Sequence, residues 1–153
     1  MERRLAEMAE ALRAAGFRVT PQRREVLRIL AKCDGHPDAG RIHRTALRTF
    51  PNVSLATVYK TLAALKAAGQ VLELEFSGQP NRYDGIRPQP HPHVICTSCG
   101  RIADPEGAAV GPLLAAVAGE TGFAIYGSRV DLYGTCPACR RRAARRRRGE
   151  GPA

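Results

Sequence analysis

Two Cys-x-x-Cys pairs contain four of the five cysteines in this chain of 153 residues. The pairs are Cys96 with Cys99 and Cys136 with Cys139, and 36 residues separate them. Two such pairs can complete the tetrahedral sulfur shell of a structural Zn2+ ion. Because zinc binding of this kind is coupled to folding, the ion would stabilise a small domain rather than take part in a reaction.

Disulfides and redox-active dithiols are the alternatives for these four cysteines. The N-terminal residues form an amphipathic pattern with Glu and Arg, without the apolar stretch of a secretory signal. No apolar run reaches the roughly 18 residues that a membrane span requires. We therefore expect a cytoplasmic location and no membrane partner. Disulfides are rare in the cytoplasm, so zinc is the favoured interpretation of the four cysteines. The fifth cysteine, Cys33, falls at an apolar position of a predicted helix, which favours a small buried side chain over a reactive thiol.

A second group of candidate metal ligands combines histidines with aspartates. His91 and His93 alternate along an extended segment, so both imidazoles could reach one ion. His36, Asp84 and Asp104 are the other candidates, although single residues at such positions are more commonly solvated loop or turn residues. Nitrogen and carboxylate ligands in this mixture suit Fe2+, Mn2+ or Zn2+, and a total of five favours iron or manganese over tetrahedral zinc.

A formal net charge of +10 and an isoelectric point near 10.1 indicate an anionic partner, with nucleic acid as the first candidate. Seven of the nine residues from Arg140 to Arg148 are arginine. Because like charges repel, we expect the C-terminal tail, residues 141–153, to be disordered. The tail would either strengthen DNA affinity without sequence preference or only keep the protein soluble.

The first half of the chain predicts short helices followed by a hairpin. Apolar residues recur at helical spacing in a segment ended by Gly16, one capped by Thr20, one from 38 to 49, and one from 54 to 68 capped by Ser54. Residues 71–76 alternate as a half-buried strand does, and Arg82 with Tyr83 is the expected return strand. This order is typical of a winged helix-turn-helix, in which the helix at 54–68 would enter the major groove of duplex DNA.

The fold class predicted for the whole chain is α+β. In the second half we expect a strand interrupted by the first cysteine pair, a helix over 112–119, and a long strand or hairpin over 123–134. A lobe of this size lies near the limit below which metals or oligomerisation supply stability. The predicted divisions are a winged-helix domain at 1–83, a hinge at 84–92, a second domain at 93–140 and the tail at 141–153.

Several motifs occur in an order that resembles one known family. They are FPNVSLATVYKTLAALKAAG, NRYDG, HPHVICTSCGRIAD and the second Cys-x-x-Cys. Over roughly residues 3–140 the chain resembles the ferric uptake regulator (Fur) family of metal-sensing repressors. The resemblance implies a winged-helix lobe, a C-terminal α/β dimerisation lobe, a four-cysteine structural zinc and a regulatory metal between the lobes. On this resemblance the sensing ligands are His36, Asp84, His91, His93 and Asp104.

Aspartates at both acidic ligand positions are similar to the peroxide-sensing (PerR) branch of the family. In that branch, bound Fe2+ reacts with hydrogen peroxide and a ligand histidine is oxidised, at positions matching His36 and His91. An oxidised imidazole is a poorer ligand, so the metal leaves and the repressor releases its DNA. The resemblance thus implies a peroxide input for this chain.

Candidate DNA contacts come partly from the resemblance and partly from side-chain chemistry. The resemblance places Tyr59 and Lys60 at base edges and Arg18 near the minor groove. Tyr59 can pack on thymine methyl groups, and Lys60 can donate to guanine acceptors. Phosphate contacts are the better interpretation for Arg23, Ser54 and Thr57, although a simple helix cap explains Ser54 equally well.

The function expected from these features is that of a metal-dependent transcriptional repressor and not of an enzyme. It would bind double-stranded operator DNA as a homodimer, with structural Zn2+ and with Fe2+ or Mn2+ as the regulatory ion. A repressor of iron or manganese uptake without peroxide sensing is the nearest alternative. A metal-dependent nucleic-acid hydrolase and a zinc-containing RNA-binding module are more remote, because the sequence marks neither a general base nor aromatic stacking platforms.

Overall fold

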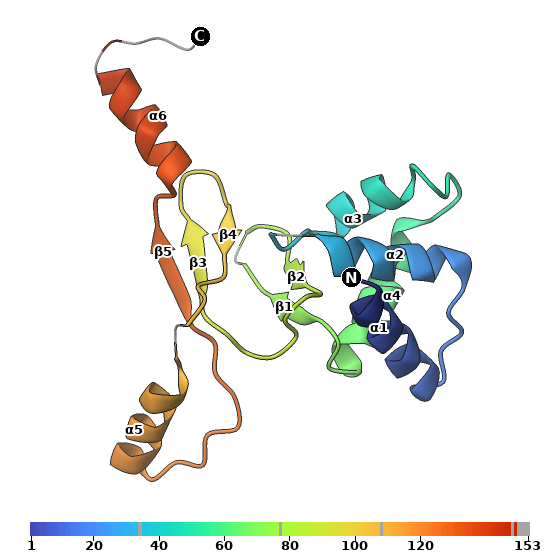
Figure 1. Cartoon of the computed structure of the whole chain (residues 1–153), viewed down its shortest axis with the longest axis horizontal. Coiled ribbons are helices and arrows are strands. Elements are labelled where there is room, and N and C mark those ends of the chain that lie inside the picture. Colours follow the sequence, from blue (N-terminus) through green and yellow to red (C-terminus); the bar gives the residue numbers. More distant parts are fainter. Residues whose placement is uncertain (34, 77, 108, 148, 150–153) are drawn as a thin grey trace. The chain divides into compact units, whose positions relative to one another are not determined.

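Figure 1 shows the computed structural model, in which the chain divides into residues 1–89, called unit 1 here, and residues 90–153, called unit 2. The residues that the structure describes are 1–33, 35–76, 78–107, 109–147 and 149. Within them, no helix combines the length and apolar character that crossing a bilayer requires. The mixture of helices with small sheets confirms the predicted α+β class.

Helices followed by one hairpin make up unit 1. The elements are α1 (Glu2–Ala14), α2 (Pro21–Lys32), α3 (Ala39–Ala46), α4 (Leu55–Ala67), β1 (Leu72–Leu74) and β2 (Arg82–Asp84). The side-chain oxygens of Thr20, Asp38 and Ser54 accept hydrogen bonds from backbone N–H groups three residues later and so cap α2, α3 and α4. The helix starts predicted at Thr20 and Ser54 are confirmed.

The core of unit 1 lies where its helices meet. Met8 and Leu12 of α1, Leu30 of α2, and Leu62 and Leu65 of α4 are at most 1% exposed. These residues recur at helical spacing, so each helix presents one apolar face to the others. The apolar faces predicted for the first, second and fourth helices are confirmed.

The third helix is shorter than predicted. It ends at Ala46 and not at Thr49, because the backbone N–H groups of Thr49 and Phe50 both donate to the carbonyl oxygen of Ala46. This tight turn is followed by Pro51, which has no N–H to continue a helix. Phe50, predicted to be buried, is only partly buried as a result.

The hairpin of β1 and β2 forms the predicted wing. Leu72 lies opposite Asp84 in the antiparallel register. Within the hairpin, the Tyr83 hydroxyl donates to the Glu73 carboxylate at 3.0 Å, and Lys66 donates to the other carboxylate oxygen at 2.5 Å. Burial alone would raise the pKa of Glu73, but these donors lower it below its ordinary value. The wing is thus fixed to the end of α4 by an ionised carboxylate.

The chain leaves β2 through a close backbone approach to α2. A Cβ atom on Gly85 would lie 2.7 Å from the Cβ of Leu30, so a larger residue does not fit without movement. The Arg4 guanidinium donates to the carbonyl oxygen of Gly85 at 2.7 Å and to the Gln70 side chain at 2.6 Å. These contacts fix the position of Asp84, the last residue of β2.

A small three-stranded sheet forms the centre of unit 2. The elements are β3 (His93–Cys96), β4 (Ile102–Ala103), α5 (Gly111–Thr121), β5 (Asp131–Gly134) and α6 (Pro137–Arg147). The central strand β3 pairs antiparallel with β4 and parallel with β5. Parallel pairing requires a crossover connection, and the segment that contains α5 supplies it (Figure 1).

Two expectations for unit 2 differ from the structure. Only Asp131–Gly134 of the predicted long strand pairs, whereas residues 123–130 form no helix or strand and leave Phe123 and Tyr126 75% and 96% exposed. The tail predicted to be disordered is helical as far as Arg147, within α6. Alanine and arginine both have high helix propensity, which outweighs charge repulsion over this length. The remainder of the predicted tail, except Gly149, lies outside the described residues.

Candidate metal centres

The four paired cysteines come together in unit 2. Cys96 ends β3, Cys99 lies in the turn after it, and Cys136 and Cys139 lie at the start of α6. Their sulfur atoms all lie within 4.8 Å of one another, and Cys99 Sγ is 3.8 Å from Cys136 Sγ. Tetrahedral Zn–S bonds of about 2.3 Å place sulfurs about 3.8 Å apart, whereas a disulfide requires about 2.05 Å. The cluster therefore fits a zinc ion.

The electrostatics of this cluster also favour a cation. The backbone N–H of Cys136 donates to Cys96 Sγ at 3.3 Å and contributes most to holding the pKa of that thiol at about 6. In contrast, hydrogen bonds with Cys99 and Cys136 raise the pKa of Cys139 to about 12. The four thiols therefore do not all ionise on their own, and a divalent cation would supply the charge that lets them do so.

His36 and Asp84 form a buried pair in unit 1. The imidazole and the carboxylate are 3% and 5% exposed, and His36 Nε2 lies 3.5 Å from Asp84 Oδ2. Local backbone contacts bring them together, because the N–H of Tyr83 donates to the carbonyl oxygen of Pro37 and Asp38 forms a bridge with Arg82. His36 itself has φ of 53°, a left-handed conformation that is uncommon outside glycine.

The Asp84 carboxylate is kept ionised despite its burial. Desolvation alone would raise its pKa, but hydrogen bonding with His36 and with the backbone N–H groups of Ile86 and Arg87 lowers it below the ordinary value. An ionised oxygen beside an imidazole nitrogen is a ligand pair that divalent iron or manganese accepts.

His91, His93 and Asp104 converge in unit 2. The two imidazole rings have centroids 4.3 Å apart and are tilted by 46°, as expected from alternate residues of an extended segment. Asp104 Oδ1 lies 3.6 Å from His91 Nε2 and 3.9 Å from His93 Nε2. Pro92 separates the two histidines in the sequence, and both imidazoles nevertheless face the same carboxylate.

Asp131 is a further residue of this group that the sequence did not indicate. It lies opposite His93 in the parallel pairing of β5 with β3, with its Oδ1 3.9 Å from His93 Nδ1. The Arg129 side chain donates to the same carboxylate at 2.8 Å. A carboxylate beside one imidazole nitrogen directs the other nitrogen toward a metal. Parallel pairing between distant segments has no local sequence signal, so Asp131 could not be identified beforehand.

Four of the six candidate DNA-contacting residues lie at the start of α4 or within it. Tyr59 is 51% exposed and Lys60 is exposed, so both project from the helix surface. Ser54 caps α4 by accepting from the N–H of Thr57 at 3.1 Å, and the two hydroxyls are 2.9 Å apart. The Ser54 side chain thus has the structural role that was the alternative to phosphate contact.

The remaining two candidates lie before and at the start of α2. Arg18 is exposed, whereas Arg23 is half-buried, with its guanidinium 5.5 Å from the centre of the Phe17 ring. Arg23 also donates to the carbonyl oxygen of Arg18 at 2.9 Å. These contacts hold the Arg23 guanidinium against the segment that precedes α2.

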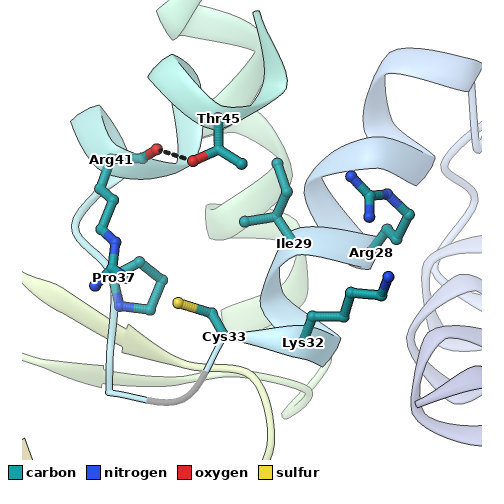
Figure 2. Close-up of a pocket in the computed structure, with 7 residues that line it drawn as sticks. All are labelled: Arg28, Ile29, Lys32, Cys33, Pro37, Arg41 and Thr45. Atoms are coloured by element: carbon teal, nitrogen blue, oxygen red, sulfur yellow. Dashed lines mark hydrogen bonds between the residues drawn. The ribbon is translucent and has the colours of Figure 1, made fainter. Parts of the chain in front are cut away.

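Cys33 is not the buried core residue that the sequence predicted. The helix α2 ends at Lys32, and Cys33 follows in an extended conformation with a half-buried side chain. It borders a cavity of about 400 Å³ (Figure 2). The lining residues are Arg28, Ile29, Lys32, Cys33, Pro37, Arg41 and Thr45.

Comparison with known proteins agrees with this arrangement. The sequence matches the ferric uptake regulator family over residues 14–133. It is 35% identical over 139 residues to the peroxide-responsive repressor PerR of Staphylococcus aureus, which covers 91% of this chain and 93% of that protein. The Campylobacter jejuni peroxide stress regulator has a TM-score of 0.69 at 32% identity, over 85% of this chain and 97% of the other. A zinc-bound manganese uptake regulator has a TM-score of 0.67 at 29% identity, over 84% of this chain and 98% of the other. The chain therefore belongs to the ferric uptake regulator family of metal-responsive regulators.

Proposed function

We propose that this protein is a cytoplasmic repressor that binds operator DNA as a homodimer when its regulatory metal site is filled. The observation that carries the proposal is the presence of buried His and Asp ligand groups in both units of a chain with a winged-helix fold. Unit 1 offers His36 and Asp84, and unit 2 offers His91, His93 and Asp104. Neither group offers more than three ligands, so five-coordinate Fe2+ or Mn2+ would require both.

Such shared ligation would connect metal binding to DNA binding. An ion held by residues of both units favours one relative orientation of the units, and in a dimer that orientation sets the spacing of two α4 helices. Half-sites about 34 Å apart would then be bound together. A change from 1:99 to 99:1 in favour of that orientation takes about 5.5 kcal/mol of differential metal affinity.

The exposed face of α4 supports a role in reading the major groove. Tyr59 can contact thymine methyl groups and Lys60 can donate to guanine, while Thr57, Arg23 and Arg18 would contact the sugar-phosphate backbone or the minor groove. Ser54 would assist by its backbone position at the N-terminus of α4. The buried face of the same helix is anchored in the core of unit 1.

Apolar residues left exposed in unit 2 support the homodimer. The helix α5 has no buried residue along its described length, and Leu113 and Val117 are 55% and 39% exposed. On β5, Leu132 and Tyr133 are 52% and 65% exposed. A second copy of the chain would cover exposed apolar residues of this kind, because such a small unit does not bury them alone.

The preferred input is hydrogen peroxide. When bound, Fe2+ would supply the one-electron chemistry that activates peroxide beside the ligands. One oxygen atom of the peroxide would enter the imidazole ring of His36 or His91, and the other would leave as water. The oxidised ring would be a weaker donor, so the site would lose its metal and the protein would then release its DNA. The PerR similarity and the aspartate at position 84 support this input over metal sufficiency alone.

Anaerobic reconstitution would test the proposal. A duplex selected from a random pool by the metal-loaded protein serves as operator, and anisotropy measures its affinity with Fe2+, with Mn2+ and without either ion. We expect tight binding with both ions, and loss after peroxide only in the Fe2+ form, with one added oxygen on the His36 or His91 peptide. Metal-dependent binding without that oxygen would instead identify a metal-uptake repressor, and binding that ignores metal would overturn the proposal.

A further inference from the structure

Helix α6 presents a dense arginine surface that the metal-dependent mechanism does not use. Arg140, Arg141, Arg142, Arg145 and Arg146 are all exposed. Among the described residues, none of the five forms an ion pair with a carboxylate. The described part of the chain beyond Asp131 contains no acidic residue that could neutralise them. The helix thus carries a dense positive charge that no carboxylate of its own described residues offsets.

Four of the five arginines lie along one face of this helix. Successive residues turn by about 100°, so Arg141, Arg142, Arg145 and Arg146 occupy a stripe about 140° wide. Along the axis, the five side chains fall within about 9 Å, which is one positive charge per about 2 Å. Duplex DNA carries one negative charge per about 1.7 Å of its axis. The linear charge densities of the helix and the duplex therefore match closely in magnitude.

The cysteine cluster fixes the start of this helix. Cys136 and Cys139 enclose its first turn, and the backbone N–H of Arg140 donates to the carbonyl oxygen of Cys136 at 3.0 Å. Arg142 lies against Cys139 Sγ at 3.9 Å, where its charge would offset that of a zinc-bound thiolate. Zinc would thus make α6 a rigid projection of unit 2 and not a flexible tail.

We infer that α6 binds the phosphate backbone of duplex DNA without reading its sequence, as a contact separate from that of α4. Guanidinium groups donate in a planar fork that suits phosphate oxygens. Like charges at spacings of three and four residues repel one another within the free helix, so a polyanion relieves that repulsion. The choice of duplex DNA over other polyanions rests on the proposed function of unit 1.

Salt dependence of binding by the full-length, zinc-loaded protein tests this inference. The variant R141Q/R145Q is compared with R141K/R145K, which keeps the charges, and with R3Q/R13Q, which removes two exposed arginines from α1. Binding to the selected operator and to an unrelated duplex is measured across salt concentrations. If each arginine neutralises one phosphate, the slope of log affinity against log salt falls by about 1.8 for R141Q/R145Q on both duplexes. The other two variants keep the wild-type slope.

Circular dichroism and zinc content confirm that R141Q/R145Q remains folded. An unchanged slope in this variant, with operator binding intact, overturns the α6 contact and leaves the proposed function standing. Absence of any duplex binding by the wild-type protein would remove the proposed function itself. If R141Q/R145Q instead loses binding only to single-stranded RNA, or only to vesicles of anionic lipid, the inference is also overturned and α6 is assigned to that partner.

Discussion

The two units of this protein are stabilised by different interactions. Unit 1 contains the hydrophobic cluster of buried residues, built from α1, α2, α3 and α4. In unit 2 the buried apolar side chains among the described residues are few, chiefly Ile95 and Ile102, and α5 buries none. Burial of apolar surface is the main favourable term in folding. Unit 1 is stabilised by this term, whereas unit 2 largely lacks it.

The shortage of buried apolar surface in unit 2 coincides with its cysteine cluster and with the exposed apolar residues of α5 and β5. Small domains that cannot bury enough surface use metals or association to become stable. We therefore expect unit 2 to depend on Zn2+ and on a second copy of the chain, while unit 1 depends on its own core. Under the proposed function, zinc would then be the structural ion, and the histidines and aspartates would hold the regulatory ion.

Removal of zinc should have the largest effect and should separate the two units. Structural zinc contributes roughly 10–16 kcal/mol of apparent binding free energy in small zinc domains. For the variant C139S we expect loss of zinc and of ordered signals from unit 2, with the helical signals of unit 1 retained. Metal analysis and amide NMR would measure this. C33S is the matched control and should keep its zinc, and an ordered unit 2 in metal-free C139S would contradict the comparison.

A cavity in the core of unit 1 should destabilise unit 1 and leave the zinc site of unit 2 intact. Leu62 is 1% exposed, and truncation of a buried leucine costs about 2–5 kcal/mol. We expect L62A to lower the free energy of unfolding of unit 1 by this amount without loss of zinc. Denaturant titration followed by metal analysis provides the check. L113A, at a 55% exposed position, is the control and should change unfolding of unit 1 little.

Substitution of Gly85 would sharpen the account of how unit 1 positions a ligand. The added methyl of G85A would meet Leu30 at 2.7 Å, and overpacking of this kind costs about 1–3 kcal/mol. Because Gly85 follows Asp84 directly, we also expect weaker binding of Mn2+ at the regulatory site. Titration with Mn2+ and thermal unfolding would measure the two effects. G127A, at a position with open space and no left-handed backbone, separates loss of glycine flexibility from the clash.

Charge placed among the exposed apolar residues of unit 2 should weaken the proposed homodimer. Leu132 is 52% exposed on β5, and L132D would bring two carboxylates into an interface that covers this residue. We expect at least a tenfold rise in the dissociation constant, which is about 1.4 kcal/mol. Sedimentation velocity measures this, and E120Q, an exposed polar change on α5, serves as control. A monomeric wild-type protein would refute the proposal that these exposed residues form a dimer interface.

Acid should destabilise unit 1 gradually. The pKa values of Glu25, Glu73 and Asp84 are lowered in the folded protein; Arg28 is the chief cause for Glu25, and hydrogen-bond donors outweigh burial for the other two. The stability that these ionised carboxylates contribute is fully present above their unfolded-state pKa values, about 4, and is lost as pH falls through their lowered folded-state pKa values. We expect E25Q to flatten the fall in unfolding free energy below that pH, whereas E10Q, at an exposed position, should not.

Sequence patterns predicted the local features of unit 1 and the cysteine cluster. Caps such as Thr20 and Ser54, and apolar residues at helical spacing, act over a few residues and are visible in one segment. Residues 123–130 were misassigned because their apolar side chains suggest a strand but find no partner strand among the described residues. Asp131 was missed for a related reason, since its position beside His93 depends on pairing between distant segments.

The backbone of His36 has a consequence for the stability of unit 1. An L-residue held at φ of 53° costs about 1–2 kcal/mol relative to the right-handed conformation. The burial of the imidazole beside Asp84 offsets this cost and holds the ring in place. Under the proposed function, unit 1 would thus give up part of its own stability to present this ring to the regulatory ion.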